Sequence, residues 1–326
     1  MTSVEEACLA ERRGPSPGSE PQAEAPHWTS GRESWVFRAG TPDELCGYHP
    51  RLISSALDRG ERLQYLLYSP VFDASDGPFH VGGSPGSHAV GITAGALLVS
   101  RDPHDDEPRR SVRRIPLGAV SSVEIGCALA LGWFVVRFYG PRGVASCPVL
   151  FRGQGIDHFR AVVRAYRLLG RGEPTPGPAR LGWPEVWRDV PVFLRREMEP
   201  LVEETERPLA LLRTPERWLA GEGWRRRRAV CASAPGLLVA TSRGLLWAES
   251  EPRPKPDSLS FGVDVTVVRP ERVRGAAIGN LDGLGVVRVR AGDRQAPREL
   301  RVLFEGGDVG SAKEIVDLAR AWGSRP

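Results

Sequence analysis

Val120–Gly126 reads Val-Ser-Ser-Val-Glu-Ile-Gly, and a similar stretch, Val-Arg-Gly-Ala-Ala-Ile-Gly, occupies Val273–Gly279. The two stretches lie 153 positions apart (273 − 120), close to half of the 326-residue chain. Both begin on valine, end on Ile-Gly and are followed by another apolar run. An internal repeat of this kind indicates a duplicated structural unit. The sequence therefore predicts two units of the same architecture.

Further matches follow in the same order along the two halves. Three pairs of short strand-like segments align: Ala96–Ser100 with Gly236–Ala240, Val135–Phe138 with Val286–Val289, and Val149–Phe151 with Val302–Phe304. Each half then ends in an amphipathic pattern typical of a helix. Four residues of the second helix take the places of four in the first: Ile315, Leu318, Ala319 and Trp322 for Phe159, Val162, Val163 and Tyr166.

The fold class expected from this pattern is mainly β with α. About seven successive strands curl into a bent sheet or partly open barrel, because curling buries one face of each strand. One apolar-faced helix would then close the open end. We therefore expect two tandem, partly open β-barrels, each capped by a C-terminal α-helix.

The chain divides into four segments by composition. Residues 1–45 are rich in Pro, Gly, Glu and Ser, which predicts a disordered tail. Trp28 and Trp35 in this tail either pack on a domain or form a short linear motif. Residues 46–170 are the first module, residues 171–190 a Pro/Gly-rich linker, and residues 191–326 the second module.

Three segments carry a resemblance to a known family: Gly91–Ser100, Ile115–Gly126 and Leu238–Trp247. They resemble the pleckstrin-homology-like superfamily, in particular its GRAM-type and bacterial PH-like branches. The resemblance implies two tandem PH-like modules. It also implies that basic residues of the first two strands and their loop grip phosphoinositide head groups.

Composition narrows the class of protein. The net charge of +4 is spread along the chain, which is not the footprint of a nucleic-acid-binding protein. The 5 cysteines show no metal-like spacing and indicate free thiols in a reducing compartment. The sequence contains no apolar run of about 18 residues, so it predicts no membrane-spanning helix. A signal peptide is not evident, so we expect a cytoplasmic protein, with peripheral membrane attachment as the alternative.

Catalytic motifs are missing from the sequence. It contains neither a Gly-x-Ser-x-Gly elbow nor a phosphate-binding P-loop. His104 with Asp105, Asp106 and Glu107 comes nearest to a metal cluster, but consecutive acidic residues in a turn are usually solvated. We expect a non-enzymatic protein without a metal or cofactor.

Two basic clusters are the candidate ligand sites. The first is a Trp-Arg run in the second module: Trp224, Arg225, Arg226, Arg227 and Arg228. Guanidinium groups beside an indole suit an anionic lipid head group. Because strand residues alternate between faces, only two of the four arginines would point the same way. A charged edge strand that resists aggregation is the alternative. The secondary patch is Arg109, Arg110, Arg113 and Arg114, for which a polar hairpin is the alternative.

Two functions remain open after this reading. One is a binding or adaptor protein that docks on an anionic membrane surface through its second module. The other is a protein-interaction scaffold that recognises a peptide or partner chain in a groove beside the closing helix. No nucleic-acid partner is expected in either case.

Overall fold

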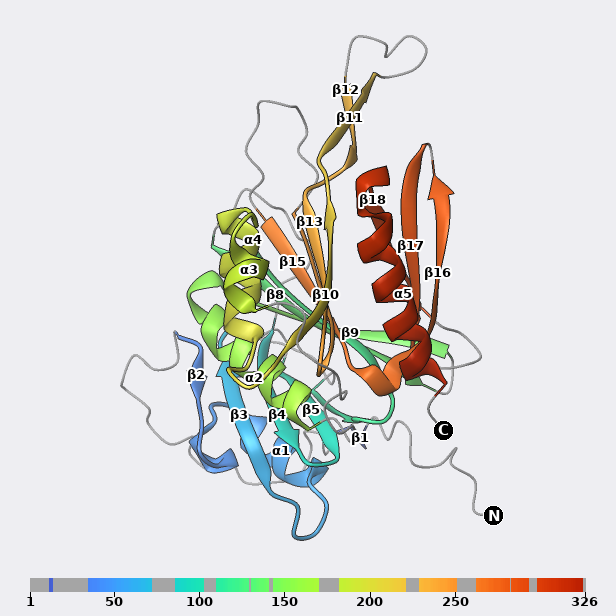
Figure 1. Ribbon diagram of the computed structural model, residues 1–326. Helices are drawn as coiled ribbons and strands as arrows, with labels where there is room; N and C mark the ends of the chain where they lie inside the picture. The colour runs from blue at the N-terminus through green and yellow to red at the C-terminus, as the bar shows by residue number, and fades with distance from the viewer. Residues whose placement is uncertain are drawn as a thin grey trace, which may run out of the picture. The chain divides into compact units, whose positions relative to one another are not determined.

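The computed structural model is mainly β with several helices, as predicted (Figure 1). It describes residues 12–13, 35–71, 86–102, 110–128, 130–140, 143–169, 182–220, 229–250, 262–281, 283–292 and 298–324. The chain forms two compact units. Unit 1 comprises residues 1–120 and 130–169, and unit 2 comprises residues 121–129 and 170–326. The finer description as PH-like barrels stays a prediction.

Unit 1 contains an antiparallel sheet, a hairpin and two α-helices. Its sheet runs in the order β1-β6-β5-β4-β3-β2. The elements are β1 (Arg12–Arg13), β2 (Phe37–Arg38), α1 (His49–Ala56), β3 (Leu63–Ser69), β4 (Ser87–Thr93), β5 (Ala96–Asp102), β6 (Ser111–Pro116), β8 (Leu131–Gly140), β9 (Gly143–Arg152) and α2 (Ile156–Leu168).

One hydrophobic cluster of unit 1 forms between α1 and the sheet. Leu52, Ile53 and Ala56 follow helical spacing on α1, so they share one face. This face packs against sheet residues such as Leu98 and Val112. Pro50 starts α1 favourably, because a proline near the first helical position gives up an amide that would have no partner there.

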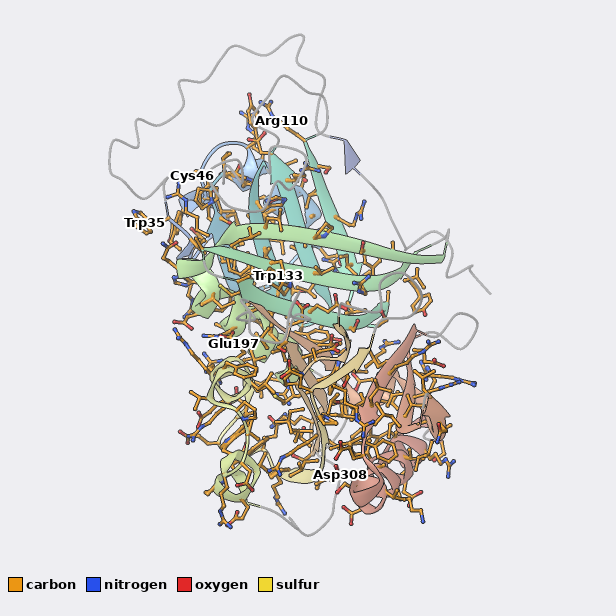
Figure 2. The ribbon with its side chains drawn as sticks, turned by 90° about the horizontal axis from the view of Figure 1, so that it is seen from above. Trp35, Cys46, Arg110, Trp133, Glu197 and Asp308 are labelled. Carbon is orange, nitrogen blue, oxygen red and sulfur yellow. The ribbon has the colours of Figure 1, made fainter. Side chains whose placement is uncertain are left out.

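The predicted tail includes residues that unit 1 buries. Val36, Ala39 and Leu45 are 9%, 3% and 2% exposed, and β2 pairs with β3. The boundary at residue 45 is therefore placed too late. These few apolar side chains lie among polar neighbours, so the composition of residues 1–45 does not reveal them, yet they pack residues 36–45 on unit 1. Trp35, labelled in Figure 2, is 54% exposed, whereas Trp28 lies outside the described residues.

A buried polar cluster links α1 to the sheet of unit 1. His49 Nδ1 lies 2.7 Å from Ser100 Oγ, and His49 Nε2 lies 2.9 Å from Ser87 Oγ. Burial lowers the pKa of His49 to about 3. Burial, reinforced by His49 and Arg101, also lowers the pKa of His88 to about 3. Both imidazoles are therefore neutral in the folded protein.

Unit 2 contains the remaining strands, one from the first half of the sequence. One run of paired strands has the order β10-β13-β14-β15-β7, a second sheet has the order β16-β17-β18, and β11 pairs with β12. The elements are β7 (Val120–Ala128), α3 (Trp183–Trp187), α4 (Val192–Met198), β10 (Pro208–Thr214), β11 (Arg217–Ala220), β12 (Ala229–Ser233), β13 (Gly236–Thr241), β14 (Gly244–Ser250), β15 (Gly262–Val268), β16 (Val273–Leu281), β17 (Leu284–Ala291), β18 (Arg298–Phe304) and α5 (Val309–Gly323).

Helix α5 packs on the sheet of β16, β17 and β18 and closes the core of unit 2 (Figure 1). Its buried side chains, such as Ile315 and Trp322, meet Val287 and Val302 of the sheet. Leu238 and Trp247 of the other sheet belong to the same cluster. The expected C-terminal helix of the second module is thus present, and it packs on this sheet.

Strand β7, which contains the repeated stretch Val120–Gly126, belongs to unit 2, although it lies in the first half of the sequence. It pairs antiparallel with β15, with Ile125 opposite Val265 and Val123 opposite Val267. The predicted first module, residues 46–170, is therefore interrupted, because Ser121–Leu129 belong to unit 2. Sequence patterns show which face of a strand is apolar, but they do not specify its partner.

The two halves nevertheless share one plan, residue by residue. Gly132 pairs with Phe151 in unit 1, and Gly285 pairs with Phe304 in unit 2, each 153 positions later. In both pairs a side-chain carbon on the glycine would overlap the phenylalanine ring. The turn amides Ala119 and Arg272, which donate to Pro116 O and Arg269 O, show the same displacement.

Some alignments made from the sequence have the wrong register. Residues 96–100 correspond to residues 244–248 rather than to 236–240. The reason is a shared threonine turn: Thr93 Oγ1 donates to Ala96 O, and Thr241 Oγ1 donates to Gly244 O. Residues 135–138 likewise correspond to 288–291, and the closing helices align at 153 positions instead of 156.

The glycine–phenylalanine pairs give a test of the shared plan. We expect Gly132→Ala and Gly285→Ala each to lower the free energy of unfolding by about 1–3 kcal/mol, because the ring must shift. Gly310→Ala, where a side-chain carbon would meet nothing within 4 Å, serves as the control. Urea unfolding measures all three. Equal stability of the three variants would contradict this packing.

The buried histidines predict a pH dependence. His49 and His88 have a pKa of 6.5 in the unfolded chain and of about 3 in the folded unit. The unfolded chain therefore binds more protons between these two pH values, so stability falls as the pH drops through this window. We expect a loss of roughly 2 kcal/mol for each histidine between pH 7 and pH 5. His49→Asn should flatten the dependence measured by urea unfolding. His158→Asn is the control, and an unchanged slope in His49→Asn would refute the assignment.

Candidate functional site

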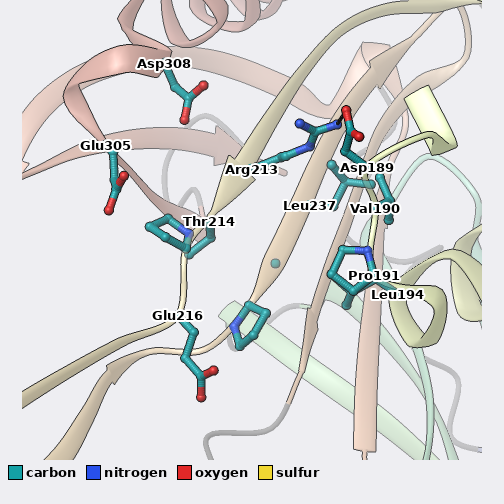
Figure 3. Close-up of a pocket in the computed structure, with 13 residues that line it drawn as sticks. Asp189, Val190, Pro191, Leu194, Arg213, Thr214, Glu216, Leu237, Glu305 and Asp308 are labelled. Atoms are coloured by element: carbon teal, nitrogen blue, oxygen red, sulfur yellow. Dashed lines mark ion pairs between the residues drawn. The ribbon is translucent and has the colours of Figure 1, made fainter. Parts of the chain in front are cut away.

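A cavity of about 320 Å³ lies within unit 2 (Figure 3). Apolar side chains form much of its wall: Val190, Pro191, Leu194, Pro215, Pro235 and Leu237. Charged side chains also line it: Asp189, Glu216, Glu305, Asp308 and Arg213. A volume of this size is at the lower end of that of small-ligand sites and matches one or two side chains of a peptide.

Prolines and short hydrogen bonds hold the wall of the cavity. Ser233 Oγ donates to Pro215 O at 2.6 Å, and Thr214 Oγ1 donates to Leu303 O at 2.9 Å. Gly236 lies under the indole of Trp247, where a side-chain carbon would come within 2.5 Å of the ring. Because proline has a fixed φ and no amide donor, this wall has little freedom to collapse.

The charges of the lining are unbalanced. Four carboxylates and one guanidinium face the cavity, a net charge of −3 (−4 + 1). Figure 3 shows Glu305 and Asp308 on one side of the cavity and Asp189 with Arg213 on the other. Like charges that surround a concave, partly apolar site raise the local concentration of the opposite charge. The cavity therefore favours a cation.

The lining carboxylates differ in how firmly they are engaged. Arg213 Nη2 lies 3.6 Å from Asp189 Oδ2, which is longer than a charge-assisted hydrogen bond. Glu305 Oε1 lies 3.3 Å from Arg217 Nη2. The carboxylate of Asp308 has no ion-pair or hydrogen-bond partner among the described residues. Asp308 is thus the acid best placed to receive an incoming cation.

Apolar side chains flank the cavity on both sides. Val192 and Phe193, at the start of α4, are 79% and 44% exposed. Val309 follows Asp308 and begins α5 with 38% exposure. A ligand that combines a positive charge with apolar neighbours would therefore contact more of this surface than a small cation.

Unit 1 has a counterpart of this cavity, and its own chain fills it. The registers of β3 with β4 and of β10 with β13 place Tyr68 at the position of Arg213. Phe37 of β2 pairs with Tyr68, their ring centroids 5.3 Å apart. Val36 packs on Gly155, the counterpart of Asp308, where a side-chain carbon would lie 2.5 Å from Val36 Cγ2.

The equivalent edge of unit 2 carries no such segment in the described part of the chain. Strand β10 pairs with β13 on one side, and no strand that the structure describes pairs with its other edge. In unit 1 that edge of β3 receives the extended residues of β2. Among the described residues, the edge of β10 that corresponds to the β2-bound edge of β3 therefore has no paired strand.

The predicted Trp-Arg run, Trp224 to Arg228, lies outside the described residues. It falls between β11 and β12, which pair up to Ala220 opposite Ala229. The lipid-binding role of the run stays a prediction.

The described arginines of the secondary basic patch, Arg110, Arg113 and Arg114, make contacts within unit 1. Arg110 Nε pairs with Asp102 Oδ1 at 2.9 Å, and its guanidinium stacks 3.3 Å from the centroid of Tyr48. Arg113 lies over the ring of Phe138 at 5.6 Å. These contacts support the polar-hairpin alternative, and Arg109 lies outside the described residues.

Arg114 takes part in a partly exposed ion-pair cluster. It pairs with Asp58 at 2.6 Å and with Glu61 at 2.7 Å. Burial alone would raise the pKa of Glu61, but hydrogen bonds from Arg114 and Thr93 lower this pKa to about 2. Such a network stabilises the fold, and it leaves the Arg114 guanidinium committed.

The described residues contain neither a metal-ligand cluster nor a membrane-spanning helix. Within them, no group of three or more His, Cys, Asp or Glu side chains could hold a metal ion. His104 to Glu107 lie outside the part of the chain described. None of the helices described has the length and apolar character needed to cross a membrane.

Comparisons with known proteins assign no family to this chain. No protein-family model matches it, and no curated protein matches it either. The resemblance to PH-like modules therefore remains a prediction from sequence.

Proposed function

We propose that this protein is a non-catalytic binding protein whose second unit recognises an extended, basic segment of a partner protein. Of the two functions left open by the sequence, this is the interaction scaffold. The observation that carries the proposal is the acidic cavity at the edge of β10, at the position where unit 1 holds its own β2 segment.

Strand addition explains how the partner backbone would bind. An extended peptide at the edge of β10 would donate and accept main-chain hydrogen bonds, as β2 does on β3. Such bonds supply affinity without reading sequence. Specificity must then come from the side chains that enter the cavity.

A basic side chain fits the cavity best. Its aliphatic stem would lie along Leu194 and Leu237, and its charged end would reach Asp308 and Glu305. In unit 1, Val36 contacts Gly155, the counterpart of Asp308. Val36 directly precedes Phe37, which pairs with Tyr68. The partner peptide should therefore carry its arginine or lysine one residue before the position opposite Arg213.

Peptide binding tests this function directly. We expect a labelled, apolar peptide with a single central arginine to bind with salt-sensitive affinity, measured by fluorescence anisotropy. The same peptide with glutamate or glutamine in place of arginine should bind at least about tenfold more weakly, because the ion pair is lost. Equal affinity of the three peptides would contradict the proposal.

Neutralising the cavity provides the matched protein variants. Glu305→Gln with Asp308→Asn should weaken the arginine peptide about tenfold and leave the glutamine peptide nearly unaffected. Glu299→Gln with Asp317→Asn removes the same charge elsewhere in unit 2 and is the control. If the control pair weakened the peptide as much, general electrostatics rather than this cavity would be the cause.

The lipid alternative is separable with the same proteins. Docking on anionic lipid predicts salt-sensitive co-sedimentation with phosphatidylserine vesicles. Arg226→Glu with Arg228→Glu would abolish it, while the Glu305 and Asp308 variants would leave it intact. That pattern, without selective binding of the arginine peptide, would assign the function to the membrane surface instead.

A further inference from the structure

Strand β16 presents an exposed edge in unit 2. It is nine residues long and pairs with β17, and no strand in the described part of the chain pairs with its other edge. Ile278 and Leu281 on it are 40% and 41% exposed. Edge strands are normally guarded by charged residues, proline or bulges, because an open edge recruits other strands.

The guarding of β16 is weak. Its one ionisable side chain is Arg274, which donates from Nε to Gly292 O at 2.6 Å within the unit. Beyond Gly275 the strand reads Ala-Ala-Ile-Gly-Asn-Leu, without charge or proline. The small residues leave the backbone accessible to a second strand.

The direction of the free backbone groups follows from the hairpin. Leu281 closes the pairing with Leu284, so alternate residues from Leu281 backwards point their amides toward β17. The N–H and C=O groups of Ala276, Ile278 and Asn280 then point outward. Arg320 Nε lies 3.4 Å from Ala276 O, which agrees with this orientation.

The repeat shows what covers such an edge. Strand β7 is the counterpart of β16, 153 positions earlier, and it pairs with β15 along its outer edge. Ile125, opposite Val265, is 2% exposed, whereas its counterpart Ile278 is 40% exposed. The outer edge of this strand is thus paired in one copy of the repeat, whereas in the other copy no described strand pairs with it.

The strand that would pair with β16, as β15 pairs with β7, can be identified from the repeat. Strand β15 in the second half of the chain corresponds to β6 in the first half. Each of these strands is followed by the same turn, which begins at Arg269 after β15 and at Pro116 at the end of β6. On its outer side β6 pairs with β1 at Ser111 and Val112. No described strand pairs with the rest of that edge of β6.

We propose that β16 pairs with β6 of a second copy of this chain. Two such junctions, related by a twofold axis, would form a closed dimer. The register of β7 with β15 predicts Val112 opposite Ile278 and Arg113 opposite Ala277. In this dimer β16 takes the place of β1 on the edge of β6.

The oligomeric state of the full-length chain is the first test. Sedimentation equilibrium should show a monomer–dimer equilibrium. Ile278→Pro removes an outward amide while leaving the ladder to β17 intact, and Ile278→Lys adds a guarding charge. Each should raise the dimer dissociation constant at least about tenfold. Val144→Lys, on an exposed residue of β9, is the control and should leave the dimer unchanged.

Cross-linking tests the partner strand and its register. Arg113 and Ala277 would form a pair without direct hydrogen bonds, in which Cα atoms lie about 4.5 Å apart, within the range of a disulfide. Tagged Arg113→Cys and untagged Ala277→Cys proteins, mixed and oxidised, should give the mixed dimer. The wild type, with its native cysteines, sets the background.

Three results would overturn the proposal. A monomeric wild type at all concentrations would exclude the dimer. Cross-linking of Ala277→Cys with itself, in preference to the mixed product, would indicate symmetric β16–β16 pairing. A disulfide within one chain of the Arg113→Cys/Ala277→Cys double variant would show that the chain covers its own edge.

Discussion

The pairing of β7 with β15 is the constraint on which the rest of the structure depends. Strand β7 is buried along almost its whole length, so its backbone amides have no water to bond and must find a neighbouring strand. Strand β15 supplies that neighbour through six pairs, from Gly262 opposite Ala128 to Val267 opposite Val123. One strand of the first half is thereby committed to the second unit, and its counterpart β16 is left at an edge.

The two units reach the same architecture with different packing. Phe159, stacked on Phe151 with ring centroids 3.9 Å apart, fills the centre of unit 1. Its counterpart on α5 is Ala312, and the volume is supplied instead by Trp322 and Trp247. Large and small side chains have exchanged places at fixed backbone positions, which cores tolerate when the total volume is kept. The backbone plan, rather than any set of core residues, is therefore what the repeat preserves.

This exchange explains how much could be predicted from the sequence. The displacement of 153 and the mainly β class were evident, because Val-x-x-x-x-Ile-Gly is distinctive and periodicity reports burial. The register of Ala96–Ser100 was wrong, since short apolar strands resemble one another and only the threonine turn distinguishes them. The closing helices were misaligned by three positions, because a shift of nearly one turn keeps the same apolar face. The partner of β7 was not predictable, as a strand's pattern does not name its neighbour.

The candidate cavity was not predictable from the sequence for a related reason. Its acids come from three separate segments, near Asp189, Glu216 and Glu305, and converge only through the fold. The counterparts of Glu305 and Asp308 in unit 1 are Arg152 and Gly155, so the shared architecture does not require acidic residues there. These carboxylates are not needed by the shared fold, and they lie beside an edge that the other copy covers with its own chain, so they support the proposal that the second unit binds a basic ligand.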